Sequence, residues 1–351
     1  MYKFDLRGQR IRMFHRQDRR APDEIPAQSS LTRNSLLLVC FLTIPVANTI
    51  HAIAKQQEPS GSFAQPLYGR EPIAHEIDLR TVYVAVTEQT GNPISDLNRE
   101  DFTVRENGVP QEILEVSPAS PTPLLIGVMV DASGSTAEDE SRHESLQAFS
   151  KFFANTLRDS DEAFVVAFGM STLRLTGITH NFPELQAGLK EIDETHPVGG
   201  TALYDCLYTV AETMSQDQTR RKIIVVFSDF EDNSSRRTLE KTISHLQKME
   251  TWIFPLVKVD RKSRQSRRVK QAVRAGNLAA RESGGVAYVS ESPREQETAL
   301  SHIQLVLRNS YALKYRATGT AKKGKSVAVK IEVQRKNAQI IAAEGRTATL
   351  P

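Results

Sequence analysis

The sequence predicts an α/β protein: a doubly wound, mostly parallel sheet with a small antiparallel β domain beside it. Short runs of apolar, branched residues alternate with longer segments whose apolar residues recur every three or four positions. This alternation is typical of a parallel sheet covered by helices. The segments on either side change to an apolar period of two, which is the period of strands with one buried face.

Strands and helices of the main sheet follow one another along the chain. The short apolar runs predict buried strands at residues 124–130, 164–168, 223–227, 252–259 and 286–289. Apolar residues at helical spacing predict helices that include residues 146–157, 203–214 and 239–246, a helix that ends at Gly284, and a last helix at 299–307. Ligands bind such sheets outside the carboxyl ends of the strands, so the residues that follow each strand are the ones to inspect.

The flanking segments predict strands instead of helices. Val82, Val84 and Val86 alternate with less apolar residues, and residues 102–105 continue the pattern up to a tight turn at 106–108. Residues 311–315 and 327–333 alternate in the same way at the other end, with a turn expected at 319–324. Neither flank is long enough for a sizeable core, so we expect them to pair into one small antiparallel sandwich.

Oxygen-bearing side chains follow the predicted strands where a metal ion would bind. Asp131, Ser133 and Ser135 end the first apolar strand, Thr201 lies in a Gly-Gly-Thr turn, and Asp229 closes the strand at 223–227. Mg²⁺ prefers oxygen ligands and keeps several waters, so hydroxyls with one or two carboxylates leave room for an external carboxylate. Mn²⁺ or Ca²⁺ would suit the same donors, whereas zinc prefers Cys and His, which do not cluster here.

This arrangement resembles the metal-ion-dependent adhesion site of von Willebrand factor A domains, which is Asp-x-Ser-x-Ser with a distant Thr and a distant Asp. Asp131, Ser133, Ser135, Thr201 and Asp229 match it residue by residue. The resemblance implies the doubly wound fold and a site in which the hydroxyls bind the ion directly and the two aspartates act partly through water. A degenerate domain that keeps the loops without binding metal is the alternative.

The three-part layout is similar to bacterial secreted proteins with an A domain. The segment GNPISDLNREDFTVRENGVPQEI before the domain carries one part of this match, and YALKYRATGT after it carries a weaker part. Five parts are predicted on this basis: a leader at 1–54, a linker at 55–72, a β-rich segment at 73–120, the A domain at 121–310, and a C-terminal β segment at 311–351 that packs with 73–120.

The leader is typical of export. Basic residues up to Arg33 precede an apolar stretch at 36–47, and Ala52-Ile53-Ala54 provides a small-x-small cleavage site. The apolar stretch is short for a membrane span. We therefore expect a periplasmic or secreted protein, with an uncleaved N-terminal membrane anchor, or a start at Met13, as alternatives.

Charge and cysteine usage limit the partners. The net charge is +3, but residues 1–54 hold eight Lys or Arg and four Asp or Glu, so the remainder is about −1. A nearly neutral body offers no general attraction to nucleic acid.

Cys206 is the single cysteine outside the leader, which excludes an internal disulfide. We expect Cys206 to pack in the core.

A dense basic segment at 261–270 follows the strand at 252–259. Topology places it on the metal face, where Arg264, Arg267 and Arg268 could steer an acidic ligand toward the ion. A solvated loop that balances acidic segments elsewhere is the competing interpretation.

Enzymatic functions fit less well. Asp131 lacks the second carboxylate two residues later that an aspartyl phosphatase needs, and the nucleophile-elbow pattern G-x-S-x-G of serine hydrolases does not occur. The sequence thus predicts a non-enzymatic binding protein, without a small-molecule substrate, that captures a carboxylate of a protein partner through a Mg²⁺-type ion. A structural assembly subunit that docks through other surfaces is the alternative, and a metal-dependent hydrolase is a weaker one.

Overall fold

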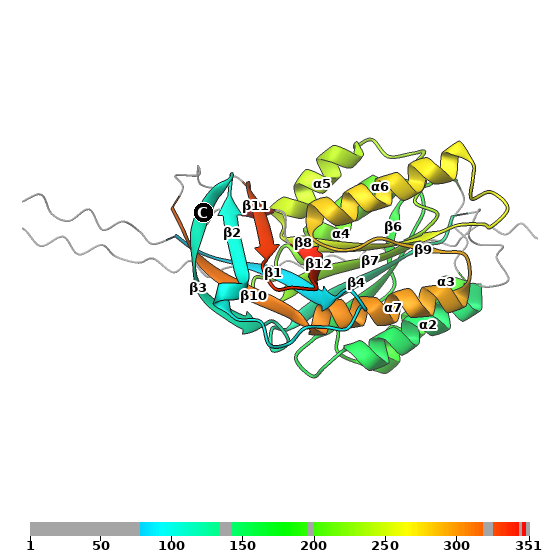
Figure 1. Cartoon of the computed structure of the whole chain (residues 1–351). Helices are drawn as coiled ribbons and strands as arrows, with labels where there is room; N and C mark the ends of the chain where they lie inside the picture. The colour runs from blue at the N-terminus through cyan, green and yellow to red at the C-terminus, as the bar shows by residue number, and fades with distance from the viewer. Residues whose placement is uncertain (1–77, 134–141, 195–198, 319–325, 344–345, 349–351) are drawn as a thin grey trace, which may run out of the picture. The chain divides into compact units, whose positions relative to one another are not determined.

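The computed structural model describes residues 78–133, 142–194, 199–318, 326–343 and 346–348 (Figure 1). Its strands form two sheets, one of six strands and one of seven. All of the described residues belong to one compact unit, Pro72–Pro351. The predicted leader, the linker, Ser135 and the turn at 319–324 lie outside the described residues.

The six-stranded sheet has the order β6-β5-β4-β7-β8-β9. Every neighbouring pair is parallel except β5 with β6, which is antiparallel. Its strands are β4 (Leu124–Asp131), β5 (Glu162–Phe168), β6 (Thr172–Arg174), β7 (Arg221–Ser228), β8 (Thr251–Lys258) and β9 (Tyr288–Ser290). The prediction of a doubly wound, mostly parallel sheet is confirmed.

Helices cover both faces of this sheet. They are α2 (Arg142–Thr156), α3 (Phe182–Glu194), α4 (Leu203–Met214), α5 (Leu239–Lys248), α6 (Arg267–Ser283) and α7 (Pro293–Arg308). Side chains of α2, α3 and α7 share one buried cluster with alternate residues of the strands, and side chains of α4, α5 and α6 share the other. In β4, for example, Ile126 and Val128 belong to the first cluster and Leu125 and Met129 to the second.

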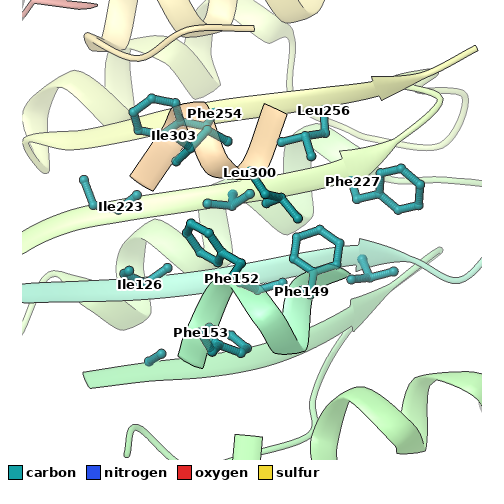
Figure 2. Packing of buried hydrophobic residues seen from close by; sticks show 14 of the residues in the cluster. Ile126, Phe149, Phe152, Phe153, Ile223, Phe227, Phe254, Leu256, Leu300 and Ile303 are labelled. Carbon is teal, nitrogen blue, oxygen red and sulfur yellow. The ribbon is translucent and has the colours of Figure 1, made fainter. Parts of the chain in front are cut away.

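Aromatic residues fill much of the first layer. Phe149, Phe152 and Phe153 of α2 point toward the strands beside Leu300 and Ile303 of α7 (Figure 2). The second layer contains Cys206, which is 2% exposed, so its predicted role in core packing is confirmed. Because helices cover both faces of the six-stranded sheet, its strands are apolar at nearly every position. This explains why the strands appear in the sequence as continuous apolar runs.

Several elements were not predicted, among them α3, β6 and β12 (Ala338–Ala343). Helix α3 has apolar residues at helical spacing, namely Leu185, Leu189 and Ile192, but they are interspersed with acidic and small residues. Strand β6 has three residues, too few for a pattern, and β12 follows a turn at Asn337 with φ 63°. Short edge strands acquire their conformation from the neighbour to which they bind.

The two flanking segments form the seven-stranded antiparallel sheet, in the order β12-β1-β10-β3-β2-β11-β13. It therefore consists of one sheet, whereas we expected a sandwich of two. The N-terminal strands are β1 (Asp78–Glu88), β2 (Phe102–Glu106) and β3 (Val109–Pro118), with a 3-10 helix η1 (Arg99–Asp101), and the C-terminal strands are β10 (Ser310–Ala317), β11 (Ser326–Val333), β12 and β13 (Arg346–Ala348).

Strands from the two ends of the chain alternate in this sheet. β1 lies between β12 and β10, and β2 lies between β3 and β11. One face buries an apolar cluster that includes Val82, Val84, Leu313 and Ile331. The same interior holds an ion pair between Arg80 and Glu106, which are 4% and 3% exposed. No helix in the described ranges is long and apolar enough to cross a membrane.

Candidate metal centre

The predicted aspartates lie at the carboxyl ends of two adjacent strands. β4 ends at Asp131, and β7 ends at Ser228, which Asp229 follows. The strands are parallel, and Val130 pairs with Phe227, so Asp131 and Ser228 are at the same level of the sheet. This edge is where α/β sheets of this kind bind ligands.

Asp131 is buried and hydrogen-bonded on both oxygens. It is 2% exposed, its Oδ1 accepts the Ser133 backbone N–H at 2.9 Å, and its Oδ2 accepts the Ser228 hydroxyl at 2.6 Å. Burial raises the pKa of the Asp131 carboxyl, hydrogen bonds from Ser133 and Ser228 oppose that rise, and the charge of Asp229 adds to it, with a raised pKa as the result. The Asp229 charge is thus close enough to influence Asp131.

Ser228 is a site residue that the sequence reasoning missed. It is fully buried, and besides donating to Asp131 its oxygen accepts the Phe230 backbone N–H at 2.9 Å. It therefore links the end of β4 to the segment that carries Asp229. The available signal was its position directly before Asp229, at the last position of an apolar strand.

The two serines of the motif differ in what the structure shows. Ser133 is 4% exposed, and both its backbone N–H and its hydroxyl bind Asp131. Ser135 lies outside the described residues, so its place at the site stays a prediction.

Thr201 lies in a loop that connects the strand ends on both sides of β4. The next residue, Ala202, donates its N–H to Gly169 after β5, at 2.8 Å. The carbonyl of Thr201 accepts the N–H groups of Asn233 and Ser234 after β7, at 3.0 and 3.1 Å. β4 lies between β5 and β7, so this loop spans the end of the strand that carries Asp131.

Asn233 holds the Thr201 loop from the other side. Its side-chain oxygen accepts the Thr201 backbone N–H at 2.8 Å. A Cβ atom at Gly200 would lie 2.3 Å from that same oxygen, so a side chain at position 200 would displace the Asn233 amide that holds the Thr201 N–H. Gly199 has φ 118°, a conformation that glycine adopts without strain. Gly200 is thus explained by its fit against the loop after β7, and Gly199 by its backbone conformation.

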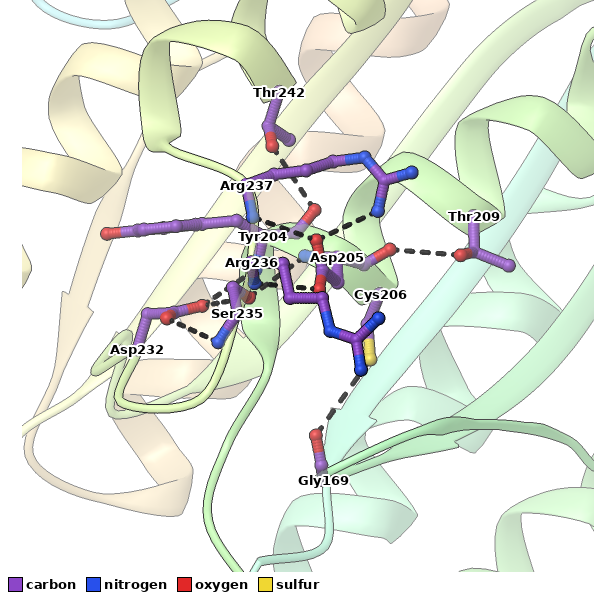
Figure 3. Close-up of polar contacts among 10 residues, drawn as sticks. All are labelled: Gly169, Tyr204, Asp205, Cys206, Thr209, Asp232, Ser235, Arg236, Arg237 and Thr242. Atoms are coloured by element: carbon purple, nitrogen blue, oxygen red, sulfur yellow. Dashed lines mark hydrogen bonds and ion pairs between the residues drawn. The ribbon is translucent and has the colours of Figure 1, made fainter.

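Two aspartates bind the start of α4 to the loop after β7 (Figure 3). Asp232 accepts the Tyr204 N–H at 2.9 Å and the Ser235 hydroxyl at 2.5 Å. Asp205, in turn, accepts the backbone N–H groups of Arg236 and Arg237 at 2.9 and 3.2 Å and the Arg237 guanidinium at 2.9 Å. Each carboxylate binds the backbone of the opposite segment, so the Thr201 loop and the Asp229 segment are held as one unit.

Asp229 begins a constrained turn. Its Oδ1 accepts the Glu231 N–H at 3.0 Å, and the next residue, Phe230, has φ 59°. A bulky residue in this left-handed region is strained. The Phe230 side chain is 1% exposed and lies in the α4–α6 layer, so its burial offsets the strain and anchors Asp229.

The predicted basic loop is partly helical. Ser266 caps α6, which begins at Arg267, so the last four residues of the segment at 261–270 belong to the helix. Arg264 forms an ion pair with Glu291 at 2.7 Å, and Arg268 forms one with Glu231. No ion pair joins Arg267 to another residue in the described part of the chain. Arg268 also lines, with Asp229, Lys258 and Asp260, a hollow of about 270 Å³.

The donor chemistry of the described residues fits a hard divalent cation. Asp131, Ser133, Thr201 and Asp229 offer carboxylate and hydroxyl oxygens at one sheet edge, which suits Mg²⁺, Mn²⁺ or Ca²⁺. Within the described ranges there is no group of three or more His, Cys, Asp and Glu residues that could hold an ion on their own. Hydroxyl ligands would therefore be needed to complete such a site.

Comparison with known families matches residues 126–231 to the von Willebrand factor type A domain. Among solved structures, the conserved hypothetical protein BatB from Bacteroides thetaiotaomicron is 12% identical, with a TM-score of 0.41, over 52% of this chain and 98% of that one. A von Willebrand factor type A protein from Catenulispora acidiphila is 10% identical, with a TM-score of 0.45, over 78% and 74%.

The pilus adhesin SpaC from Lactobacillus rhamnosus GG, in its open conformation, is 11% identical, with a TM-score of 0.44, over 77% of this chain and 49% of that one. Comparison with curated proteins gives no match. The family match covers β4, β5 and β7 with the helices between them, which is the part of the sheet that carries Asp131, Thr201 and Asp229. The chain therefore contains a von Willebrand factor type A domain.

Proposed function

We propose that this protein is an exported, non-enzymatic binding module that captures an acidic residue of a protein partner through a bound Mg²⁺-type ion. Asp131, Ser133, Ser135, Thr201 and Asp229 would hold the ion, with Mn²⁺ or Ca²⁺ as possible substitutes. The observation that carries the proposal is the buried Asp131 carboxylate, held by Ser133 and Ser228 at the strand end that the Thr201 loop spans.

The ligand types explain why the partner would be acidic. Hydroxyl oxygens carry no formal charge, so an ion held mainly by Ser and Thr keeps most of its positive charge. Mg²⁺ also keeps water in open coordination positions, and a carboxylate of a partner can replace one of these waters. The chain's own residues would supply the placement, because Ser228 and Asn233 fix Asp131 and the Thr201 loop.

The basic residues after β8 would assist the encounter. Arg264 and Arg268 are engaged with Glu291 and Glu231, and both arginine side chains are still more than half exposed. Such exposed charges act mainly on the association rate at low salt. Neutralising Arg264, Arg267 and Arg268 should slow association with an acidic ligand at low ionic strength, and an unchanged rate would count against steering.

Calorimetric titration of Mg²⁺ and Mn²⁺ into the metal-stripped full chain tests the metal site. We expect saturable binding by the parent, loss of binding in Asp131→Asn and Thr201→Val, and no change in Asp159→Asn, which alters an exposed aspartate outside the site. Absence of binding in the parent would identify a degenerate domain.

Partner capture separates the two non-enzymatic functions. Capture abolished by chelator and by Asp131→Asn supports metal-mediated binding. Capture that survives both changes would indicate docking through other surfaces, with metal acting at most on stability. Turnover of a phosphomonoester that disappears in Asp131→Asn would indicate a hydrolase instead.

A further inference from the structure

Helix α6 begins with basic residues where the other helices of the sheet begin with acidic ones. The first turns of α2, α3, α4, α5 and α7 each contain Asp or Glu. The first turn of α6 contains none, and Arg267, Arg268 and Lys270 lie at its start. Positive charges at the positive end of a helix dipole are unfavourable for the helix. The folding of α6 therefore does not explain these residues.

Three of the basic residues of α6 form a stripe along its solvent face. Arg267, Lys270 and Arg274 are exposed and follow the spacing i, i+3, i+7, which places them within an arc of about 60° at 3.6 residues per turn. The buried residues of the helix, Ala272, Gly276, Ala279, Ala280 and Ser283, lie on the opposite side. The stripe is thus directed away from the sheet.

The charges of this stripe are available to a partner. No ion pair joins Arg267, Lys270 or Arg274 to any residue that the structure describes. Arg268, on another side of the same helix, is paired with Glu231, and Arg281, near the end of the helix, is paired with Glu282. The stripe extends over about 10 Å, from seven residues at 1.5 Å each.

The stripe begins next to the candidate metal centre. Ser266, Arg268 and Val269, from the start of α6, line the same hollow of about 270 Å³ as Asp229. A partner that placed a carboxylate at the metal edge could therefore continue along α6 without leaving the surface. In extended conformation, about three residues at 3.3 Å each would cover the stripe.

We infer that Arg267, Lys270 and Arg274 form a docking surface for an acidic protein segment, which places one carboxylate on the metal ion and further carboxylates along α6. The inference rests on the proposed function and specifies the partner: an acidic run, not a single acidic residue. A lipid surface fits less well, because the apolar face of α6 is already buried against the sheet and no apolar face is left to enter a bilayer.

Two labelled peptides test this inference with the full chain: a decaglutamate, and a decapeptide with one glutamate among serines. Binding is measured at low salt, with Mg²⁺ and with chelator. The stripe variant is Arg267→Gln/Lys270→Gln/Arg274→Gln. Its control, Lys190→Gln/Lys241→Gln/Lys314→Gln, removes the same charge from exposed lysines of α3, α5 and β10.

We expect the parent and the control variant to bind decaglutamate about tenfold more tightly than the single-glutamate peptide, and the stripe variant to lose most of that difference. The stripe variant should bind Mg²⁺ like the parent, with an unchanged or slightly higher Tm, because the removed charges oppose the helix dipole. Equal losses in the two variants, or equal binding of the two peptides by the parent, would overturn the inference.

The same experiment separates the two proposals. If the parent binds no Mg²⁺, the proposed metal function fails, and stripe-dependent binding of decaglutamate in chelator still supports the docking surface. Stripe-dependent binding to phosphatidylglycerol vesicles without binding of decaglutamate would overturn the acidic protein segment in favour of a membrane.

Discussion

At the scale of single residues, the site depends on groups that support the predicted ligands. Ser228 is the clearest case, because one buried hydroxyl donates to Asp131 and accepts from the Phe230 backbone. The metal-site motif includes the neighbouring residues Asp131 and Asp229 but does not include Ser228. The structure adds the residue that holds one aspartate and fixes the turn after the other.

Ser228→Ala is expected to weaken Mg²⁺ binding by about 10- to 100-fold, because it removes a hydrogen bond that orients Asp131. It should also lower the free energy of unfolding by about 1–3 kcal/mol, because the Phe230 N–H loses its acceptor in a buried place. Calorimetry and urea denaturation measure the two effects. Ser301→Ala, which removes an exposed hydroxyl on α7, is the control. Unchanged Mg²⁺ affinity would show that Ser228 has only a structural role.

The ion pair of Arg80 and Glu106 provides a prediction for the seven-stranded sheet. Glu106 also accepts the Tyr315 hydroxyl at 2.8 Å, and it is buried with Arg80. Glu106→Ala should lower the free energy of unfolding by about 3 kcal/mol, because it leaves the buried Arg80 guanidinium with the partly exposed Asp78 as its remaining ion-pair partner. Arg80→Met combined with Glu106→Leu should cost less than the single change, since it removes both buried charges and leaves Asp78, which is partly exposed to water. A greater loss in the double variant, measured by urea denaturation, would contradict this account.

At the scale of elements, the turn between α4 and β7 responds to pH. Burial acts to raise the pKa of Asp217, but hydrogen bonds from the Arg220 guanidinium and from the N–H groups of Thr219 and Arg220 outweigh it and lower the pKa to about 2. The contribution of a carboxyl with a lowered pKa is fully present above its unfolded value near 3.8. It is lost as the pH falls toward 2.

Asp217→Asn should therefore reduce the free energy of unfolding by about 2 kcal/mol at pH 7 and by much less near pH 2. Denaturation of parent and variant across this range measures the difference. Asp159→Asn, at an exposed position, is the control for the substitution itself. A loss that stays constant from pH 7 to pH 2 would show that the charge of Asp217 does not stabilise the turn.

At the scale of the whole molecule, the two ends of the chain depend on each other. β1 is bonded on both sides by C-terminal strands, β10 and β12. A chain that ends at residue 309 should leave Val82, Val84 and Val86 without their cover and expose unpaired strand edges. We expect increased binding of a hydrophobic dye and self-association in light scattering. A monomeric truncated chain with no added dye binding would show that the N-terminal strands do not need the C-terminal ones.

Much of the fold could be predicted because it depends on local patterns. The strands β4, β5, β7 and β8 are apolar at nearly every position, and the helices α4 and α5 have one regular apolar face. The partnership of the two flanks could also be expected, since neither can bury a core alone. The number of sheets that the two flanks form could not be predicted, because β2 pairs with β11 and β1 pairs with β12, and these strands are distant in sequence.

The sequence by itself determined the residue types of the candidate site, since Asp131, Ser133, Thr201 and Asp229 follow recognisable strands and turns, and sheet topology brings strand ends together. Only the tertiary structure decided which residues support them. Hydrogen bonds to distant segments of the chain give Ser228, Asn233 and Asp232 their roles. Arg268, unlike Arg267, forms an ion pair, because Glu231 lies beside it in the fold. Local periodicity encodes burial and secondary structure, whereas polar partnership depends on distances that exist only in the folded chain.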